Sequence, residues 1–154
     1  MNEPHPLNDV RHCLCRSTRR AARALTRAYD TALAPAGLTV SQFSLLAVLA
    51  SHGPLGVTRL AAELDLDRTT LTRNLKPLVK AGLVETRSGR DARARPVALT
   101  RLGRKRFAAA RPLWARTQAD MVARLEQSGG ARDLLARLGA AEAAALNRQA
   151  SEHG

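Results

Sequence analysis

Aromatic residues are scarce in this sequence: phenylalanine, tryptophan and tyrosine together make up 3% of the 154 residues. A core with so few aromatic side chains has to be built from leucine, valine and alanine, and this composition favours helices. The apolar fraction of 45% is normal for a folded protein and argues against global disorder. A chain of this length forms one compact domain, with or without helical extensions.

Long apolar runs are missing as well. No run approaches the roughly 18 residues that cross a bilayer, and the opening MNEPHPLND has no apolar signal-peptide core. We therefore expect a cytoplasmic protein, in a compartment where thiols are kept reduced. The only cysteines are Cys13 and Cys15, and this compartment argues against a structural disulfide between them.

The sequence also lacks the residue patterns of an enzyme. Its four histidines are scattered, and it has no Gly-rich phosphate loop and no histidine pair on one helix face. No Ser/His/Asp arrangement occurs in a recognisable context. We therefore predict no catalytic residues, no cofactor and no metal site.

Acidic residues are outnumbered by basic ones, 13 to 25, which gives a formal net charge of +12. Residues 56–106 alone carry 13 basic and 5 acidic side chains, a net charge of +8. A field of this strength attracts polyanions, nucleic acid first and anionic membranes second. The charge therefore predicts a polyanion-binding surface in the middle of the chain.

The first predicted helix covers residues 8–34, with Asn8 as its cap and Pro35-Ala36-Gly37 as its end. Its apolar side chains share one stripe: Val10, Leu14, Ala21, Leu25, Ala28, Tyr29 and Ala32. Five arginines fall on the opposite face: Arg16, Arg19, Arg20, Arg23 and Arg27. A capping box from Thr39 to Gln42 then predicts a buried helix that ends near Ser51.

Two helices joined by a short turn follow. The first runs from Arg59 to Leu64 with Thr58 as its cap. The second starts after Asp67 and runs to Ala81, with Gly82 behind it. So short a connection predicts a helix-turn-helix. We expect a bend or a loss of regularity at Pro77 of the second helix. Four of its side chains should lie in the core: Leu71, Leu75, Leu78 and Val79.

Residues 83–86 and 96–99 are predicted strands that flank a loop with four arginines, and this basic hairpin completes a winged helix. Thr100 caps a helix predicted to reach Gln127, and a last helix follows the break at Gly129-Gly130. The terminal helices have apolar faces that nothing in a small winged-helix domain covers. The fold class is therefore mainly α with a small β-hairpin: residues 38–99 form the winged helix-turn-helix, and residues 8–34 and 100–150 a helical dimerisation region.

The most specific segment, residues 60–85, has the sequence LAAELDLDRTTLTRNLKPLVKAGLVE, followed by Asp91-x-Arg93 and Val97-x-Leu99-Thr100-x-x-Gly103. In this combination the chain resembles the MarR family of bacterial transcription regulators along nearly its whole length. The resemblance implies a homodimer, joined through its terminal helices, on a palindromic operator in double-stranded DNA. It also implies a repressor released by a small ligand or by oxidation.

The candidate DNA-binding residues follow from how such modules contact DNA. Arg68 and Arg73 are candidates for bidentate guanine contacts, and Asn74 for reading adenine. Thr69, Thr70 and Lys76 are better placed for phosphates or thymine methyls, and Thr72 is a further candidate on the same outer face. In the wing, the family pattern implies that Arg93 enters the minor groove, oriented by Asp91, with Arg90 and Arg95 on phosphates.

Two other readings would also explain the charge. A non-specific architectural DNA-binding protein needs the basic surface but no ordered module for reading a groove. A membrane-surface helix at residues 8–34 is the other, but its apolar stripe is narrow and rich in alanine, which suits a helix interface better than lipid.

The cysteines allow three readings. On an uninterrupted helix Cys13 and Cys15 lie roughly 160° apart, so their sulfurs cannot bond while the helix is intact. Arg19, one turn after Cys15, favours its reactive thiolate. The hydroperoxide-sensing branch of the MarR family has a reactive cysteine at the position of Cys15 and a tyrosine at that of Tyr29, but other tyrosines where this chain has Arg19 and Val40. Thiol sensing, packing at a dimer interface and metal capture with His12 all stay open.

Overall fold

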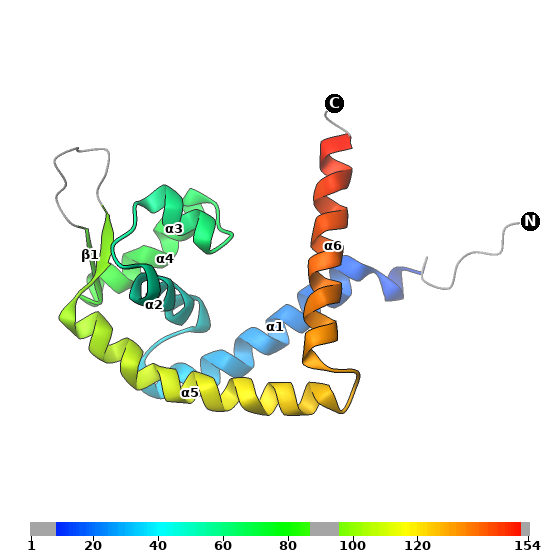
Figure 1. Ribbon diagram of the computed structural model, residues 1–154, viewed down its shortest axis with the longest axis horizontal. Helices are drawn as coiled ribbons and strands as arrows, with labels where there is room; N and C mark the ends of the chain where they lie inside the picture. Colours follow the sequence, from blue (N-terminus) through cyan, green and yellow to red (C-terminus); the bar gives the residue numbers. More distant parts are fainter. Residues whose placement is uncertain (1–8, 87–95, 152–154) are drawn as a thin grey trace, which may run out of the picture. The chain divides into compact units, whose positions relative to one another are not determined.

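The computed structural model describes residues 9–86 and 96–151. The chain divides into two compact units, Met1–Trp114 and Ala115–Gly154, which are described separately. The first contains α1 to α4, the hairpin and the start of α5, and the second contains the rest of α5 and α6 (Figure 1). Among the described helices none is by itself long and apolar enough to cross a membrane; Leu14–Ala36 and Val40–His52 qualify only as a pair, bent by 69°.

The N-terminal helix begins later than predicted. Asp9 caps a 3-10 turn, Val10–His12, by accepting a hydrogen bond from the Arg11 amide at 2.7 Å. Cys13 then has an extended backbone (φ −58°, ψ 120°), and α1 runs from Leu14–Leu33. The single helix predicted from Asn8 was wrong, because the Asp9 cap starts a separate turn that ends at Cys13. Asn8 itself lies outside the described residues.

The predicted capping box at the start of α2 (Val40–His52) is confirmed. The Thr39 hydroxyl accepts from the Gln42 amide at 3.3 Å, and the Gln42 side chain accepts from the Thr39 amide at 3.0 Å. The Asp30 carboxylate also accepts from the Val40 amide at 2.7 Å, which fastens α1 to the start of α2. A short 3-10 turn, Ala34–Ala36, and Gly37 at φ 67° make the corner between these two helices.

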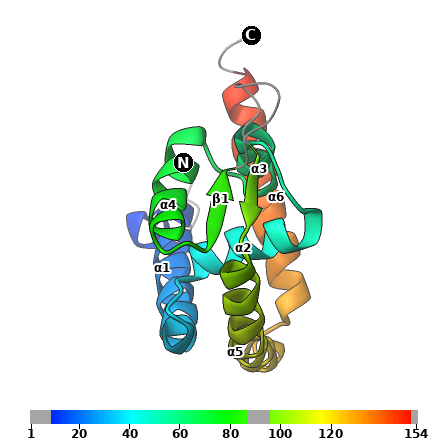
Figure 2. The same ribbon diagram turned by 90° about the vertical axis from the view of Figure 1, so that its left-hand side faces the viewer.

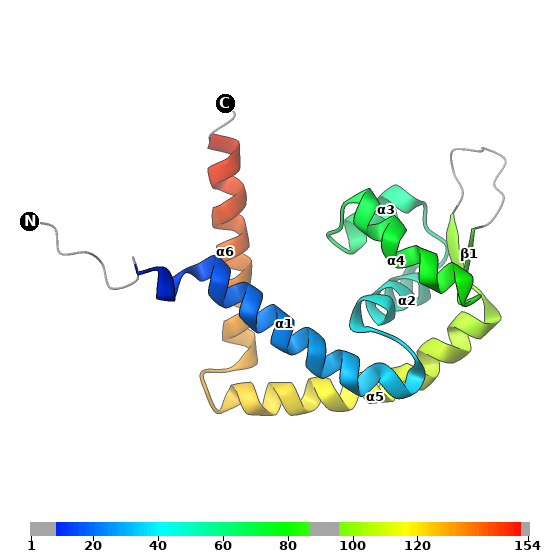
Figure 3. The same ribbon diagram turned by 180° about the vertical axis from the view of Figure 1, so that it is seen from behind.

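The predicted helix-turn-helix is present as α3 (Val57–Glu63) and α4 (Arg68–Lys80), seen from behind in Figure 3. Gly56, not Thr58, is the N-cap of α3, so that helix starts earlier than expected. α4 continues as one helix through Pro77. Leu71, Leu75 and Leu78 are buried as predicted, but Val79 is 49% exposed. Val79 lies past the edge of the buried stripe, beside the hairpin strands in a shallow apolar hollow.

The hairpin pairs β1 (Val84–Thr86) with β2 (Val97–Leu99) in antiparallel register, Val84 opposite Leu99 (Figure 2). Leu55 adds a bridge to Val97 on the other edge of β2. Thr100 then caps α5 (Arg101–Glu126), since its hydroxyl accepts from the Gly103 amide at 3.0 Å. Gly103 packs so closely on the hairpin that a Cβ there would lie 1.9 Å from the Leu83 carbonyl oxygen.

The core of the first unit is built mainly of leucines from α1 to α4 and from the hairpin. Three of the four aromatic side chains lie together. Phe43 is buried, 5.3 Å from Phe107 and stacked 5.6 Å from Trp114 between ring centroids. These contacts attach the start of α5 to α2, so the scarce aromatic residues serve mainly to join two helices.

In the second unit, α5 ends at Glu126 and α6 (Ala131–Ser151) begins after Gly129 and Gly130, whose φ values are 112° and 93°. The break predicted at these glycines is therefore confirmed. Large apolar side chains on α6 remain exposed in the single chain: Leu135 (68%), Leu138 (42%) and Leu146 (59%).

Candidate nucleic-acid interface

The orientation of α4 is fixed at its N-terminus and along its buried face. The Asp67 carboxylate accepts from the Thr70 amide at 2.9 Å and from the Thr70 hydroxyl at 2.6 Å. These two bonds hold the pKa of Asp67 below its ordinary value, and the bond from the Thr70 hydroxyl has the larger effect. Leu71, Leu75 and Leu78 anchor the helix in the core. The remaining face of α4 must therefore point outward.

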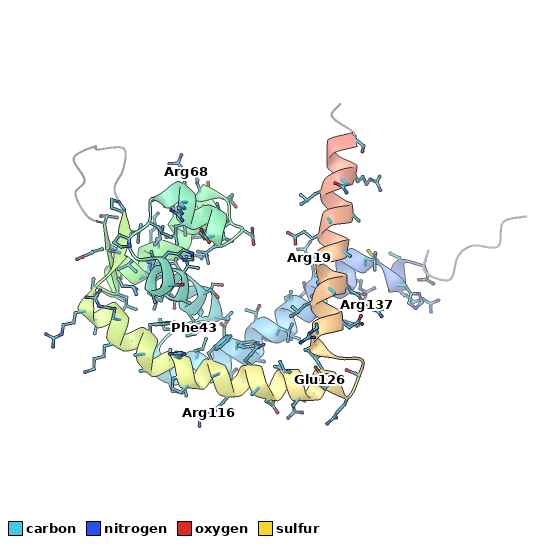
Figure 4. All side chains as sticks on the ribbon, viewed as in Figure 1. Arg19, Phe43, Arg68, Arg116, Glu126 and Arg137 are labelled. Carbon is cyan, nitrogen blue, oxygen red and sulfur yellow. The ribbon has the colours of Figure 1, made fainter. Side chains whose placement is uncertain are left out.

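That outward face carries a concave, basic surface that we call the α4 hollow. It has a volume of about 350 Å³ and is lined by Arg68, Thr69, Thr72, Arg73 and Lys76. Each of these side chains is exposed, and Arg68 lies at an outer edge of the helix-turn-helix in Figure 4. The described lining contains three cationic side chains and no acidic one. Five of the candidate residues predicted from the sequence are thus brought together.

Two further candidates on α4 lie apart from this hollow. Thr70 is half-buried, and its hydroxyl donates to Asp67, the N-cap residue, so Thr70 supports the helix cap. Asn74 is half-buried and does not line the hollow. Within the hollow, the Thr72 hydroxyl donates to the Arg68 carbonyl at 2.7 Å, so its one hydroxyl proton is already engaged. The sequence predicted Asp67 as the cap of this helix. It did not indicate that the cap would engage the Thr70 hydroxyl.

The wing candidates Arg90, Asp91, Arg93 and Arg95 lie outside the described residues. The strands that flank them are described: Thr86 pairs with Val97 at the end of the hairpin next to residues 87–95. Val97 is also held by Leu55 through two backbone hydrogen bonds of 2.8 and 3.0 Å. The base of the wing is therefore fixed to the same unit as α4.

The two cysteines share a second hollow, at the start of α1, which we call the thiol hollow. Its lining consists of Cys13, Cys15, Arg16, Arg19 and Arg23. The expected placement of the two sulfurs on opposite edges of one helix was wrong, because Cys13 is the extended residue before α1 and Cys15 lies in its first turn. Both thiols are free; Cys13 is half-buried and Cys15 is exposed.

Tyr29 does not belong to the thiol hollow within one chain. It lies fourteen residues after Cys15 on α1, roughly 21 Å along the helix axis. Partial burial raises the pKa of its hydroxyl. Arg19, in contrast, is in the hollow as expected, and Arg23 joins it. The spacing of Cys15, Arg19 and Arg23, four residues each, was the sequence signal for this cluster.

Neither hollow has the donors of a metal centre. Among residues 9–86 and 96–151, no group of three or more His, Cys, Asp or Glu side chains is placed to hold an ion. His12, the third member of the metal reading, does not line the thiol hollow. The chemistry that these residues offer is therefore anion binding at both hollows and nucleophilic thiols at one.

Comparison with known proteins shows the family to which this chain belongs. The model of the MarR family matches residues 36–94, the segment that contains α2 to α4 and β1. A solved structure of the Mycobacterium tuberculosis transcriptional regulator MosR in complex with DNA is 43% identical, with 86% of this chain and 98% of that one covered and a TM-score of 0.72. The chain belongs to the MarR family. It is a DNA-binding transcription regulator with a winged helix-turn-helix.

Two further relatives agree with this assignment. YwoH, a helix-turn-helix-type transcriptional regulator of Bacillus subtilis, is 32% identical over 98 residues, which are 64% of this chain and 72% of YwoH. The overoxidised form of AbfR bound to DNA is 28% identical, with 75% of this chain and 88% of AbfR covered and a TM-score of 0.62. Both MosR and AbfR were solved bound to DNA, and α4 is the second helix of the helix-turn-helix that this chain shares with its family.

Proposed function

We propose that the protein is a homodimeric, sequence-specific repressor that binds a palindromic operator through α4 and the wing. The α4 hollow is the observation that carries this proposal, because it joins two guanidinium groups, an ammonium and two threonines on one exposed face. Guanidinium forks match guanine edges, and lysine and threonine suit phosphates or thymine methyls. The wing and the strands belong to the same DNA-binding region, residues 38–99.

The roles follow from position on α4. Arg68 is the first residue of the helix, and Arg73 lies on the same exposed face; both are assigned to guanine. Lys76 and Thr69 are assigned to phosphates, and Thr72 presents its methyl group to thymine. Asn74 is assigned to adenine from the edge of the face, and Thr70 acts mainly through the helix cap. In the wing, Arg93 enters the minor groove beside Asp91, while Arg90 and Arg95 bind phosphates.

The dimer is supported by apolar surface that the single chain leaves uncovered. On α1, Leu14 is 76% and Leu25 is 40% exposed, and the leucines of α6 add to this. Large exposed apolar patches in a folded protein mark an interaction site. A second copy covers identical faces with a two-fold axis, the commonest oligomer symmetry. Residues 8–34 and 100–150 are accordingly assigned to dimerisation.

Release from DNA is assigned to a small effector or to oxidation of Cys15. The specific support for oxidation is that Cys15 is exposed and shares a hollow with three arginines, where a reagent from solution can reach its sulfur. Loss of operator binding after hydroperoxide treatment of the wild type, but not of Cys15→Ser, is the expected result. Equal loss of operator binding in both proteins would refute release through Cys15 oxidation.

The experiment for the DNA-binding proposal is selection of preferred sites from random duplexes, followed by footprinting. We expect a two-fold symmetric site whose half-site centres lie about 10 bp apart. Arg68→Ala and Arg73→Ala should relax the selected sequence, whereas Arg116→Ala, an exposed arginine elsewhere on α5, should not. Recovery of no preferred sequence would instead support a non-specific architectural protein.

A further inference from the structure

The thiol hollow combines nucleophiles and positive charge in a way that DNA binding does not explain. It has a volume of about 310 Å³, and two free thiols and three guanidinium groups line it. It lies at the start of α1 and shares no lining residue with the α4 hollow. A small molecule that enters it meets a reactive sulfur and several cationic donors at the same time.

The positive charge of this hollow is not compensated locally. The sequence has no acidic residue between Asp9 and Asp30. Asp9 is already held by Arg11 at 2.7 Å, outside the hollow. Within the described residues, Arg16, Arg19 and Arg23 have no carboxylate at ion-pair distance. The three guanidinium groups therefore keep their charge available for an anion from solution.

The start of the helix adds to this field. Cys13 is the N-cap residue of α1, and Cys15 is its second helical residue. The first turn of a helix carries partial positive charge from its unpaired backbone N–H groups. This contribution is smaller than that of the three arginines, but it acts on Cys15 from a fixed direction.

The arginines of α1 and its exposed leucines lie on different faces of the helix. The arginines of α1 follow spacings of three and four residues and fall within an arc of about 100° on the helix. Leu14 and Leu25, the exposed apolar side chains of α1, fall on the opposite side. Cys15 lies between these two faces, about 40° around the helix from Arg19 and about 80–100° from the leucines. A partner that packs on the leucine face alone therefore leaves the arginines and the side of Cys15 next to Arg19 uncovered.

We propose that the thiol hollow selects thiol-reactive small molecules that carry a carboxylate, such as acid-bearing organic hydroperoxides, over neutral molecules of the same size. The arginines hold the carboxylate, and Cys15 attacks the reactive atom. This inference rests on the proposed release by cysteine oxidation and names the class of reactant. Concave surfaces lined by one sign of charge raise local counter-ion concentrations and association rates by roughly 10- to 1,000-fold.

With a hydroperoxide, the reaction is a two-electron oxidation of sulfur. The Cys15 thiolate donates an electron pair to the terminal oxygen, an S–O bond forms and the O–O bond breaks. The products are a sulfenic acid on Cys15 and an alkoxide, which takes a proton from water and leaves as the alcohol. The carboxylate takes no part in this step and serves only to bring the reactant to the hollow.

The test compares alkylation of Cys15 by iodoacetate and by iodoacetamide, which differ mainly in charge. Cys13→Ser in the full chain isolates Cys15, and mass spectrometry follows the rates at about 0.1 M salt. We expect the iodoacetate-to-iodoacetamide rate ratio to be about tenfold or more above that of a free cysteine derivative. In 1 M salt, where the screening length is about 3 Å, it should fall toward the free-thiol value.

Matched arginine variants locate the effect. Arg19→Gln and Arg23→Gln should each lower the ratio, whereas Arg27→Gln should leave it nearly unchanged. Arg27 lies on the same face of α1 but outside the hollow, about 18 Å along the helix from Cys15. A ratio equal to that of the free thiol, or one that Arg27→Gln lowers as much as Arg19→Gln does, would overturn the proposal.

A carboxylate-bearing hydroperoxide and its methyl ester separate this inference from the proposed release. We expect the acid to abolish operator binding at lower concentration than the ester. Equal potency would overturn the charge selection while leaving oxidation-dependent release in place. If neither compound releases DNA and alkylation is still selective for the anion, the release proposal fails and the selectivity of the hollow stands.

Discussion

The Asp67 carboxylate accepts two hydrogen bonds from Thr70, one from its backbone amide at 2.9 Å and one from its hydroxyl at 2.6 Å. The pair closes the N-terminus of α4 one residue before Arg68, the first side chain of the α4 hollow. The cap therefore determines that α4 begins at Arg68, and so where the Arg68 side chain lies on the exposed face. The first prediction depends on this relationship.

Asp67→Ala should lower both the free energy of unfolding and the affinity for DNA, because the first turn of α4 loses its cap. Asp67→Asn, which keeps an accepting oxygen, should lose less of either. Urea titrations and operator-binding curves for both variants give the comparison. If Asp67→Ala binds DNA as the wild type does, the cap does not position Arg68.

The cap also predicts a pH dependence. Hydrogen bonds from Thr70 lower the pKa of Asp67 in the folded chain below the ordinary value of 3.8. The resulting stabilisation is present above that ordinary value and is lost as the pH falls through the lower, folded value. The unfolding free energy of the wild type should therefore decrease more than that of Asp67→Ala as the solution is taken from pH 5 to pH 2. Parallel curves for the two proteins would contradict this assignment.

Two glycines in helices should respond to alanine in opposite directions. At Gly103 a Cβ would meet the Leu83 carbonyl oxygen, so Gly103→Ala should destabilise the fold by at least about 1–3 kcal/mol. At Gly139 in α6 nothing lies within 4 Å, and Gly139→Ala should be neutral or stabilise by up to about 1 kcal/mol. Chemical denaturation measures both. A stable Gly103→Ala protein would contradict the close approach of α5 to the hairpin.

The exposed leucines predict how assembly can be disrupted. Leu25→Glu and Leu135→Glu each place a charge in a face that we assign to the dimer, and should shift the protein toward monomer in sedimentation equilibrium. Thr26→Glu is a charge-matched control one residue further on α1, about 100° around the helix from Leu25. Dissociation by Thr26→Glu as strong as by Leu25→Glu would place the interface elsewhere.

Much of the fold was predictable because local signals agreed with one another. The capping box at Thr39 and the cap at Asp67 each started a helix where expected, and Gly82 and Gly129-Gly130 ended or separated helices. The basic face of α4 followed from the leucine spacing, because the buried stripe leaves only one face for the arginines. Each of these features depends on residues close together in the chain, so the sequence alone indicates them.

The thiol hollow was the main failure of sequence-based prediction. Helical periodicity continues through Cys13, so nothing in the apolar pattern indicated that the backbone becomes extended there. The break arises from the preceding turn, which Asp9 caps through a bond to Arg11. A competing local cap thus overrode the periodicity and moved both thiols into one hollow with three arginines.

The central claim is that α4 reads sequence, and not only charge. The direct measurement is the ratio of affinities for the selected operator and for unrelated DNA at 0.15 M salt, in wild type, Arg68→Ala and Lys76→Ala. We predict a wild-type ratio of at least about 1,000. Arg68→Ala should lose about 1–3 kcal/mol of that discrimination, whereas Lys76→Ala should weaken binding to both DNAs alike. A wild-type ratio near one, or equal loss on both DNAs for Arg68→Ala, would contradict the account.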